Sequence, residues 1–153
     1  RDVIISYSNH YRIEPREAFD RMHSQHNHIW ATDSLERFEF LSRWDTHVLS
    51  WNSLSIPKLF LRYEDMLETP ERSIKKIFEF LDLEPVISTE KIVDLTNFAN
   101  LSKQEAVNGF NEAVNGATFF NQGKSQQWKD LDLALLNEVT EAFGEAMGVF
   151  GYE

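Results

Sequence analysis

Two groups of polar residues have the types and spacing that could support chemistry. His23, His26 and His28 cluster, and Asp20 precedes His23 by about one helical turn. Imidazole and carboxylate groups are ordinary ligands of zinc and nickel, so a metal site is one interpretation of this cluster. The spacing matches no metal-binding motif, and an exposed polar turn between two helices is the favoured interpretation.

The second group is the loop Phe119-Phe120-Asn121-Gln122-Gly123-Lys124. Its amides, its lysine and its backbone N–H groups are the kinds of donor that bind an oxyanion. The chain has neither a G-x-x-x-x-G-K-[ST] loop nor a G-x-G-x-x-G motif, and no serine lies in a nucleophile elbow. Taken alone, residues 119–124 are therefore a weak indication of anion binding.

Composition excludes several classes of protein. The 153 residues fit one domain or a large piece of one, and 42% of them are hydrophobic, which is enough for a core. The absence of cysteine excludes disulfides, thiolate metal sites and a cysteine nucleophile. With 15 basic and 25 acidic residues, the net charge of −10 disfavours nucleic acid and anionic membranes as partners. No apolar run is long enough to span a bilayer.

The beginning of the sequence predicts a piece of a longer protein. Position 1 is Arg, and the chain enters the apolar run Val3-Ile4-Ile5 without a polar leader. We therefore expect a fragment, a processed product or the C-terminal part of something longer.

Periodicity and capping residues predict a mostly helical chain. Residues 3–11 fit either a strand or a helix capped by Asp2. Helix starts are expected at Pro15, at Asp33 or Ser34, at Pro70, at Ser88 and after Trp128. The helix from 33 or 34 would carry one long apolar stripe, composed of Leu35, Phe38, Leu41, Trp44, Val48 and Trp51.

Two further segments complete this picture. The continuously apolar run Leu59-Phe60-Leu61 is typical of a buried strand in a parallel sheet. Residues 99–127 are rich in Asn and Gln and contain three of the six glycines, so we expect an irregular segment there.

Six short motifs follow one another along the chain: R-D-V-I-I-S-Y at 1–7, W-D-T-H-V-L-S-W at 44–51, L-R-Y-E-D-M at 61–66, a helical pattern at 70–83, T-N-F at 96–98, and G-K-S-Q-Q-W-K at 123–129. In this order and spacing they resemble the cytosolic-type sulfotransferases over nearly the whole chain. These enzymes transfer a sulfuryl group from 3′-phosphoadenosine 5′-phosphosulfate (PAPS) to an alcohol, phenol or amine.

The resemblance implies an α/β fold of the P-loop NTPase-like sulfotransferase type. This chain would be its mostly helical C-terminal portion, residues 1–153 of a single domain, with at least one buried parallel-type strand. Residues 3–11 would then be a helix that presents its N-terminal turn to an anion.

The resemblance also implies a set of nucleotide-binding residues. Ser6 would bond the 3′-phosphate of PAPS, whereas Tyr63, Thr96 and Phe98 would contact the adenine by hydrogen bonding and stacking. The remaining phosphate contacts would come from the loop of Asn121, Gln122, Gly123 and Lys124. No metal is implied.

Departures from the family pattern affect the phosphate loop. The family opens this loop with Arg-Lys, and here the positions are Asn121 and Gln122. A charge-assisted hydrogen bond is roughly twice as strong as a neutral one, so the affinity for the 3′-phosphate should fall unless Lys124 compensates. The family's later Gly and Asp are Gln126 and Gln127.

The 5′-phosphosulfate loop, the lysine that stabilises the leaving phosphate and the catalytic base precede this segment in the family. We therefore expect no catalytic residue and no complete active site in these 153 residues. The expected function is PAPS-dependent sulfuryl transfer to a hydroxyl or amine of a small acceptor in the cytoplasm, with the 3′-phosphoadenosine half-site supplied by this chain. The alternative is a non-catalytic helical binding module derived from the same fold. The sequence specifies neither the acceptor nor the oligomeric state.

Overall fold

The computed structural model describes residues 1–30, 38–110 and 118–152. They form two compact units. Unit 1 comprises Arg1–Ser55 and Gln126–Glu153, and unit 2 comprises Ile56–Ser125.

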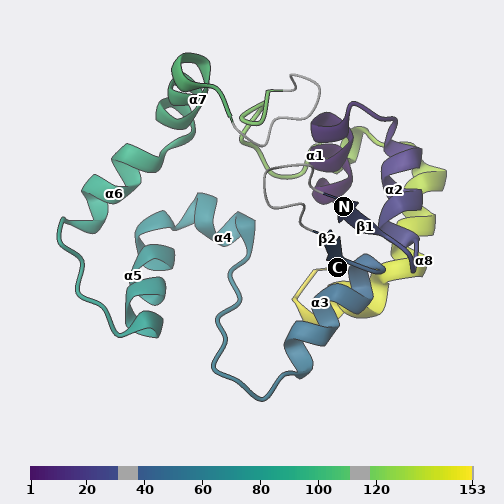
Figure 1. Ribbon diagram of the computed structural model, residues 1–153, viewed down its shortest axis with the longest axis horizontal. Coiled ribbons are helices and arrows are strands. Elements are labelled where there is room, and N and C mark those ends of the chain that lie inside the picture. The colour runs from purple at the N-terminus through teal and green to yellow at the C-terminus, as the bar shows by residue number, and fades with distance from the viewer. Residues whose placement is uncertain (31–37, 111–117, 153) are drawn as a thin grey trace. The chain divides into compact units, whose positions relative to one another are not determined.

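Unit 1 consists of helices and one small sheet (Figure 1). Its elements are α1 (Asp2–Tyr11), α2 (Pro15–His23), β1 (His28–Trp30), β2 (Phe38–Phe40), α3 (Trp44–Ser53), the 3-10 turn η1 (Gln127–Asp130) and α8 (Leu133–Val149). The two strands are antiparallel, with His28 opposite Phe40 and Trp30 opposite Phe38.

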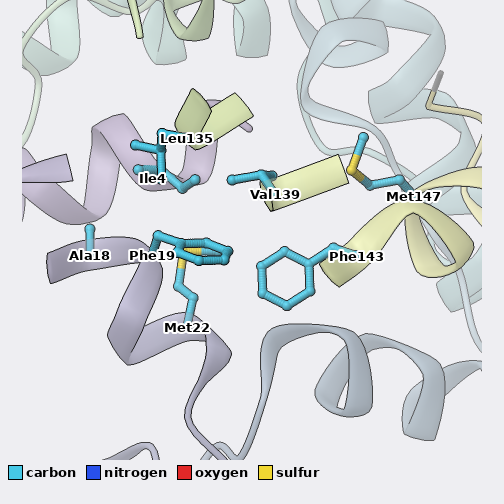
Figure 2. Close-up of a cluster of buried hydrophobic side chains, with 8 residues drawn as sticks. All are labelled: Ile4, Ala18, Phe19, Met22, Leu135, Val139, Phe143 and Met147. Carbon is cyan, nitrogen blue, oxygen red and sulfur yellow. The ribbon is translucent and has the colours of Figure 1, made fainter. Parts of the chain in front are cut away.

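The core of unit 1 joins its first two helices to its last (Figure 2). Its buried side chains are Ile4, Ala18, Phe19, Met22, Leu135, Val139, Phe143 and Met147. Phe143 of α8 meets Phe19 of α2 edge to face at 5.8 Å, and it is 2% exposed. Burying a side chain of this size contributes about 1.5–3 kcal/mol, so this cluster is the main reason that segments so far apart in sequence lie together.

Unit 2 is a succession of helices without a comparable core. Its helices are α4 (Tyr63–Glu68), α5 (Pro70–Leu81), α6 (Thr89–Thr96) and α7 (Phe98–Asn108). Among its described residues the buried side chains are the polar Ser73 and Thr89, and none is hydrophobic.

The capping signals located most helices correctly. The helices predicted from Pro15, Pro70 and Ser88 are present, and the Ser88 side chain accepts a hydrogen bond from the N–H of Lys91. Residues 3–11 are helical, as the resemblance implied. The helix expected after Trp128 begins at Leu133 and is capped by the Asp132 side chain.

The helix predicted from Asp33 or Ser34 is wrong where the chain can be described. Phe38–Phe40 is a strand, Ser42 has a φ of 57°, and α3 begins only at Trp44. Asp33, Ser34 and Leu35 lie outside the described residues. The alternation of Phe38, Glu39 and Phe40 suits a pleated strand. These residues pair with β1 and therefore form a strand, although the apolar residues around them have helical spacing.

The irregular segment predicted for 99–127 is also partly wrong, because α7 occupies Phe98–Asn108. The Asn97 side chain accepts a hydrogen bond from the N–H of Asn100 and so starts this helix.

The strand expected at Leu59-Phe60-Leu61 is absent: these residues belong to no strand, and Phe60 is 46% exposed. A strand requires a partner, and in the described residues the only strands are β1 and β2. The observed sheet is antiparallel, so the part of the fold prediction that required a buried parallel strand is not met in the residues that the structure describes.

Candidate functional site

Ser6 lies on the second turn of α1, on a face that is open to solvent. Its side chain is exposed, whereas Ile4 on the same helix is fully buried against the core. The next residue, Tyr7, is half-buried, and burial together with the nearby Tyr11 raises the pKa of its phenol. The core therefore fixes α1 through Ile4 and leaves the Ser6 hydroxyl accessible to a ligand.

The N-terminus of α1 is tied to the segment that follows the predicted phosphate loop. The Asp2 carboxylate accepts the backbone N–H of Gln126 at 2.6 Å and that of Trp128 at 2.9 Å. Arg1 lies over the Trp128 ring, 4.8 Å from its centroid, and donates to the Thr140 hydroxyl at 3.3 Å. The sequence predicts Asp2 as the cap of this helix. In the structure Asp2 is instead the first residue of α1, and its side chain binds the end of the loop.

Unit 2 brings two of the predicted nucleotide-binding residues into direct contact. Gly123 has a φ of +62°, and a Cβ at this position would lie 2.2 Å from Cδ2 of the Phe98 ring. Only glycine avoids this overlap and adopts such a φ without strain. Phe98, the first residue of α7, also meets Phe120 edge to face at 6.2 Å. The contact places the base of the loop directly against the ring expected to touch adenine.

The other predicted adenine contacts are accessible. Tyr63 is the first residue of α4 and is 48% exposed. Thr96 ends α6, is exposed, and donates its hydroxyl to the Ile92 carbonyl at 2.8 Å.

The loop side chains form a donor set that suits an anion. Asn121, Gln122 and Lys124 are exposed, and Gly123 is half-buried against Phe98. Together they offer two amides and one ammonium group, which are hydrogen-bond donors to phosphate oxygens. Such donors can bind an oxyanion, and they carry fewer positive charges than the family pattern supplies.

Glu105, which the sequence did not single out, holds the start of this loop. Its two carboxylate oxygens accept the backbone N–H groups of Phe119 and Phe120 at 2.6 and 3.0 Å. Phe119 lies fourteen positions after Glu105, and no local pattern in the sequence marks the pair.

The predicted site residues are divided between the two units. Ser6 belongs to unit 1, whereas Tyr63, Thr96, Phe98 and the loop 121–124 belong to unit 2. The expectation that Ser6 and the loop act on one phosphate therefore stays a prediction.

The histidines of the alternative metal site have other partners. Nε2 of His23 lies 2.8 Å from Nη1 of Arg43, and Nδ1 of His28 lies 2.8 Å from the His26 carbonyl oxygen. In residues 1–30, 38–110 and 118–152, no group of three or more His, Cys, Asp or Glu side chains is arranged to hold a metal ion.

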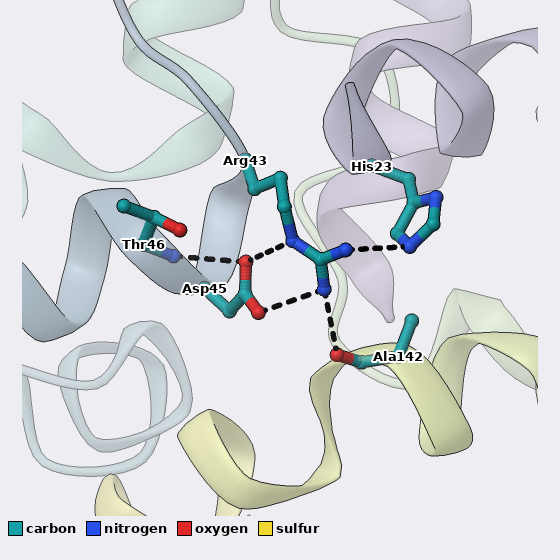
Figure 3. A network of polar contacts seen from close by, with 5 residues as sticks. All are labelled: His23, Arg43, Asp45, Thr46 and Ala142. Carbon is teal, nitrogen blue, oxygen red and sulfur yellow. Dashed lines mark hydrogen bonds and ion pairs between the residues drawn. The ribbon is translucent and has the colours of Figure 1, made fainter. Parts of the chain in front are cut away.

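Arg43 is the centre of a polar network that sequence reasoning missed (Figure 3). Its guanidinium binds both carboxylate oxygens of Asp45 at 2.9 Å and donates to the Ala142 carbonyl of α8 at 3.2 Å. The Arg43 guanidinium, aided by the Thr46 N–H, holds the pKa of the Asp45 carboxyl below its ordinary value. The network fixes the start of α3 against α8.

Comparison with known proteins decides the family. A family model for the sulfotransferase domain matches residues 1–151. The chain belongs to the sulfotransferase family.

Relatives of known type agree with this assignment. Sulfotransferase 1A1 of Bos taurus is 32% identical over 155 residues, which cover 93% of this chain and 50% of that protein. Sulfotransferase 1A1 of Rattus norvegicus is 31% identical, with the same two shares. Cytosolic sulfotransferase 8 of Arabidopsis thaliana is 35% identical over 97 residues, or 56% of this chain and 29% of that protein.

The sulfotransferase chain thus spans about half the length of the curated mammalian relatives it matches. In the part that the structure describes, no helix is long and apolar enough to cross a membrane.

Proposed function

We propose that this sulfotransferase chain is the C-terminal part of a single domain and supplies the 3′-phosphoadenosine half-site. The complete enzyme would transfer a sulfuryl group from PAPS to a hydroxyl or amine of a small acceptor. The contact between Gly123 and the Phe98 ring carries this proposal, because it joins the phosphate loop to an adenine-contacting position. The family match over residues 1–151 supplies the reaction class.

Each proposed nucleotide contact has a physical role. Ser6 donates its hydroxyl to the 3′-phosphate, and Asn121, Gln122 and Lys124 donate from the loop. Phe98 and Tyr63 offer ring faces to adenine, and Thr96 offers a hydroxyl.

The catalytic groups are proposed to lie in the part of the protein that corresponds to the half of the relatives not spanned by this chain. Unit 2 is consistent with this proposal, since among its described residues no hydrophobic side chain is buried, as expected if further protein packs against it.

The names of the relatives indicate a cellular location, and the net charge limits the kinds of partner. The Arabidopsis relatives are named cytosolic sulfotransferases, and we place this protein in the cytosol on that basis. The net charge of −10 argues against nucleic acid or an anionic membrane as a partner.

Thermal unfolding with added nucleotide tests the proposal. Adenosine 3′,5′-bisphosphate should raise the unfolding temperature of the full chain, because a ligand at 100 times its Kd stabilises the native state by about 2.7 kcal/mol. Adenosine 5′-monophosphate is the matched control, since it lacks the 3′-phosphate. Ser6→Ala should reduce the shift caused by the bisphosphate and leave the response to the monophosphate unchanged.

Two results would contradict the proposal. No shift at millimolar bisphosphate would favour the non-catalytic binding module. Product formed from PAPS and a phenol by this chain alone would show that the half-site assignment is wrong.

A further inference from the structure

We propose that Glu105 is a positioning residue that sets the shape of the nucleotide loop without touching the nucleotide. This inference rests on the proposed function, because it concerns the same loop. The Glu105 carboxylate accepts hydrogen bonds from the backbone N–H groups of Phe119 and Phe120, at 2.6 and 3.0 Å.

These bonds impose a turn immediately before the phosphate-binding positions. In an extended strand, consecutive residues point to opposite faces, so two successive N–H groups cannot both reach one carboxylate. The next N–H, that of Asn121, donates to the Phe119 carbonyl at 2.9 Å and tightens the turn. Three successive backbone donors, those of Phe119, Phe120 and Asn121, are thus committed inside the protein.

Aromatic contacts hold the same turn against α7 and the residues that follow it. Phe119 stacks on Phe110 with ring centroids 4.4 Å apart, and it meets Phe120 edge to face at 5.1 Å. Phe120 in turn contacts Phe98, which lies against Gly123. These ring contacts hold the turn against Phe98 of α7 and against Phe110. The two hydrogen bonds to Glu105 set the orientation of its backbone.

Positioning and direct electrostatics predict opposite effects when the charge of Glu105 is removed. A carboxylate near a phosphate site repels the phosphate, so Glu105→Gln would tighten phosphate binding if charge alone mattered. If Glu105 acts by positioning, the same substitution weakens binding, because a glutamine amide offers one acceptor oxygen and turns an NH₂ donor towards the second N–H. The sign of the change therefore separates the two explanations.

The test uses three variants of the full chain. Glu105→Gln removes the charge, and Glu105→Asp keeps it but shortens the side chain by one methylene. Glu79→Gln, an exposed acid in the last turn of α5, is the matched control. Two quantities are measured: the exchange rates of the Phe119 and Phe120 amide protons by NMR, and the Kd for adenosine 3′,5′-bisphosphate.

Both Glu105 variants should speed exchange of these two amide protons at least tenfold and raise the Kd roughly tenfold, as expected when charge-assisted bonds are lost. Glu79→Gln should change neither quantity. If Glu105→Gln does not fold, Glu105→Asp decides the question.

Unchanged exchange rates, or a lower Kd in Glu105→Gln, would overturn the inference. Failure of the proposed function looks different: the unsubstituted chain would bind no bisphosphate, while the exchange rates would still respond to substitution of Glu105.

Discussion

The Asp2 carboxylate accepts the backbone N–H of Trp128, a residue 126 positions further along the chain, at 2.9 Å. A second bond, from the N–H of Gln126 at 2.6 Å, makes the contact bidentate. Glu105 binds the beginning of the same loop through two other backbone N–H groups. The segment from Phe119 to Trp128 is therefore bound at its start by the Glu105 carboxylate and at its end by the Asp2 carboxylate. In the sequence, the proposed phosphate-binding residues lie between these two ends.

Replacing Asp2 with asparagine should release the end of the loop. Asparagine has the same size, but it offers one acceptor oxygen for two N–H groups and directs an NH₂ at one of them. We expect the free energy of unfolding of unit 1 to fall by roughly 1–3 kcal/mol, as for other losses of a hydrogen bond to a charged group. Urea denaturation followed by tryptophan fluorescence measures this change.

The control for this variant is Asp130→Asn, which removes an exposed acid from η1, close to the same segment. Equal stability of the Asp2 and Asp130 variants would mean that the two backbone bonds contribute nothing beyond the loss of one negative charge.

Gly123→Ala should disrupt the proposed nucleotide site. The added methyl group would lie 2.2 Å from the Phe98 ring, so either the ring or the loop must move. We expect the affinity for adenosine 3′,5′-bisphosphate to fall at least tenfold, or by about 1.4 kcal/mol. Isothermal titration calorimetry measures the change.

Gly109→Ala provides the comparison, because Gly109 also has a positive φ, of 73°, but a methyl group there would meet no atom within 4 Å. That substitution carries the backbone cost of about 1–3 kcal/mol without the steric overlap. Truncating the ring in the double variant Phe98→Ala/Gly123→Ala should make the two changes non-additive. Equal losses of affinity in the Gly123 and Gly109 variants would exclude the ring contact as the cause.

The Arg43–Asp45 pair should make unit 1 sensitive to acid. The folded-state pKa of Asp45 lies below its ordinary value of 3.8, chiefly because of the hydrogen bonds from Arg43. The pair therefore stabilises the fold at pH values above about 5, and this contribution is lost as the pH falls through 4 towards the lower folded-state pKa. Measuring the free energy of unfolding from pH 7 to pH 3 tests the sign of this effect.

Asp45→Asn should lower the free energy of unfolding by about 1–3 kcal/mol at pH 7, because it leaves a partly buried guanidinium without its carboxylate. The difference from the unsubstituted chain should shrink at acid pH. Glu17→Gln, which breaks the exposed pair with Arg21 in the same unit, should have an effect of about 0–1 kcal/mol. A constant difference across the pH range would contradict the assignment to Asp45.

Helices with local start signals could be predicted from the sequence. Pro15, Pro70 and Ser88 act within one turn of their own position, so a reading of a few residues locates the helix starts. The family resemblance supplied what local signals did not, since it resolved residues 3–11 as a helix.

Contacts between distant residues could not be predicted in this way. Phe38–Phe40 is a strand because β1 pairs with it, and its helical spacing carries no information about that partner. The high Asn and Gln content of residues 99–127 predicts an irregular segment, so α7 is missed. The start of α7 depends on the capping side chain of Asn97. The bonds of Asp2 and Glu105 to the loop join residues 14 to 126 positions apart and leave no periodic trace.

Restoring the cations of the family pattern should strengthen the proposed site. In the double variant Asn121→Arg/Gln122→Lys, two neutral amides become charged donors at exposed loop positions. Since charge-assisted hydrogen bonds are roughly twice as strong as neutral ones, we expect the affinity for adenosine 3′,5′-bisphosphate to rise by about tenfold or more. The gain should decline as salt is added from 0.05 to 0.5 M, conditions under which the Debye length shortens from roughly 14 to 4 Å.

A double variant with the same added charge, Gln25→Arg/Asn137→Lys, places both cations at exposed positions of unit 1 and should leave the affinity nearly unchanged. Adenosine 5′-monophosphate should bind equally to all three proteins, because it lacks the phosphate that the loop is proposed to hold. If the affinity gain is the same for both nucleotides, the added charge acts by general attraction, and residues 121–124 do not recognise the 3′-phosphate.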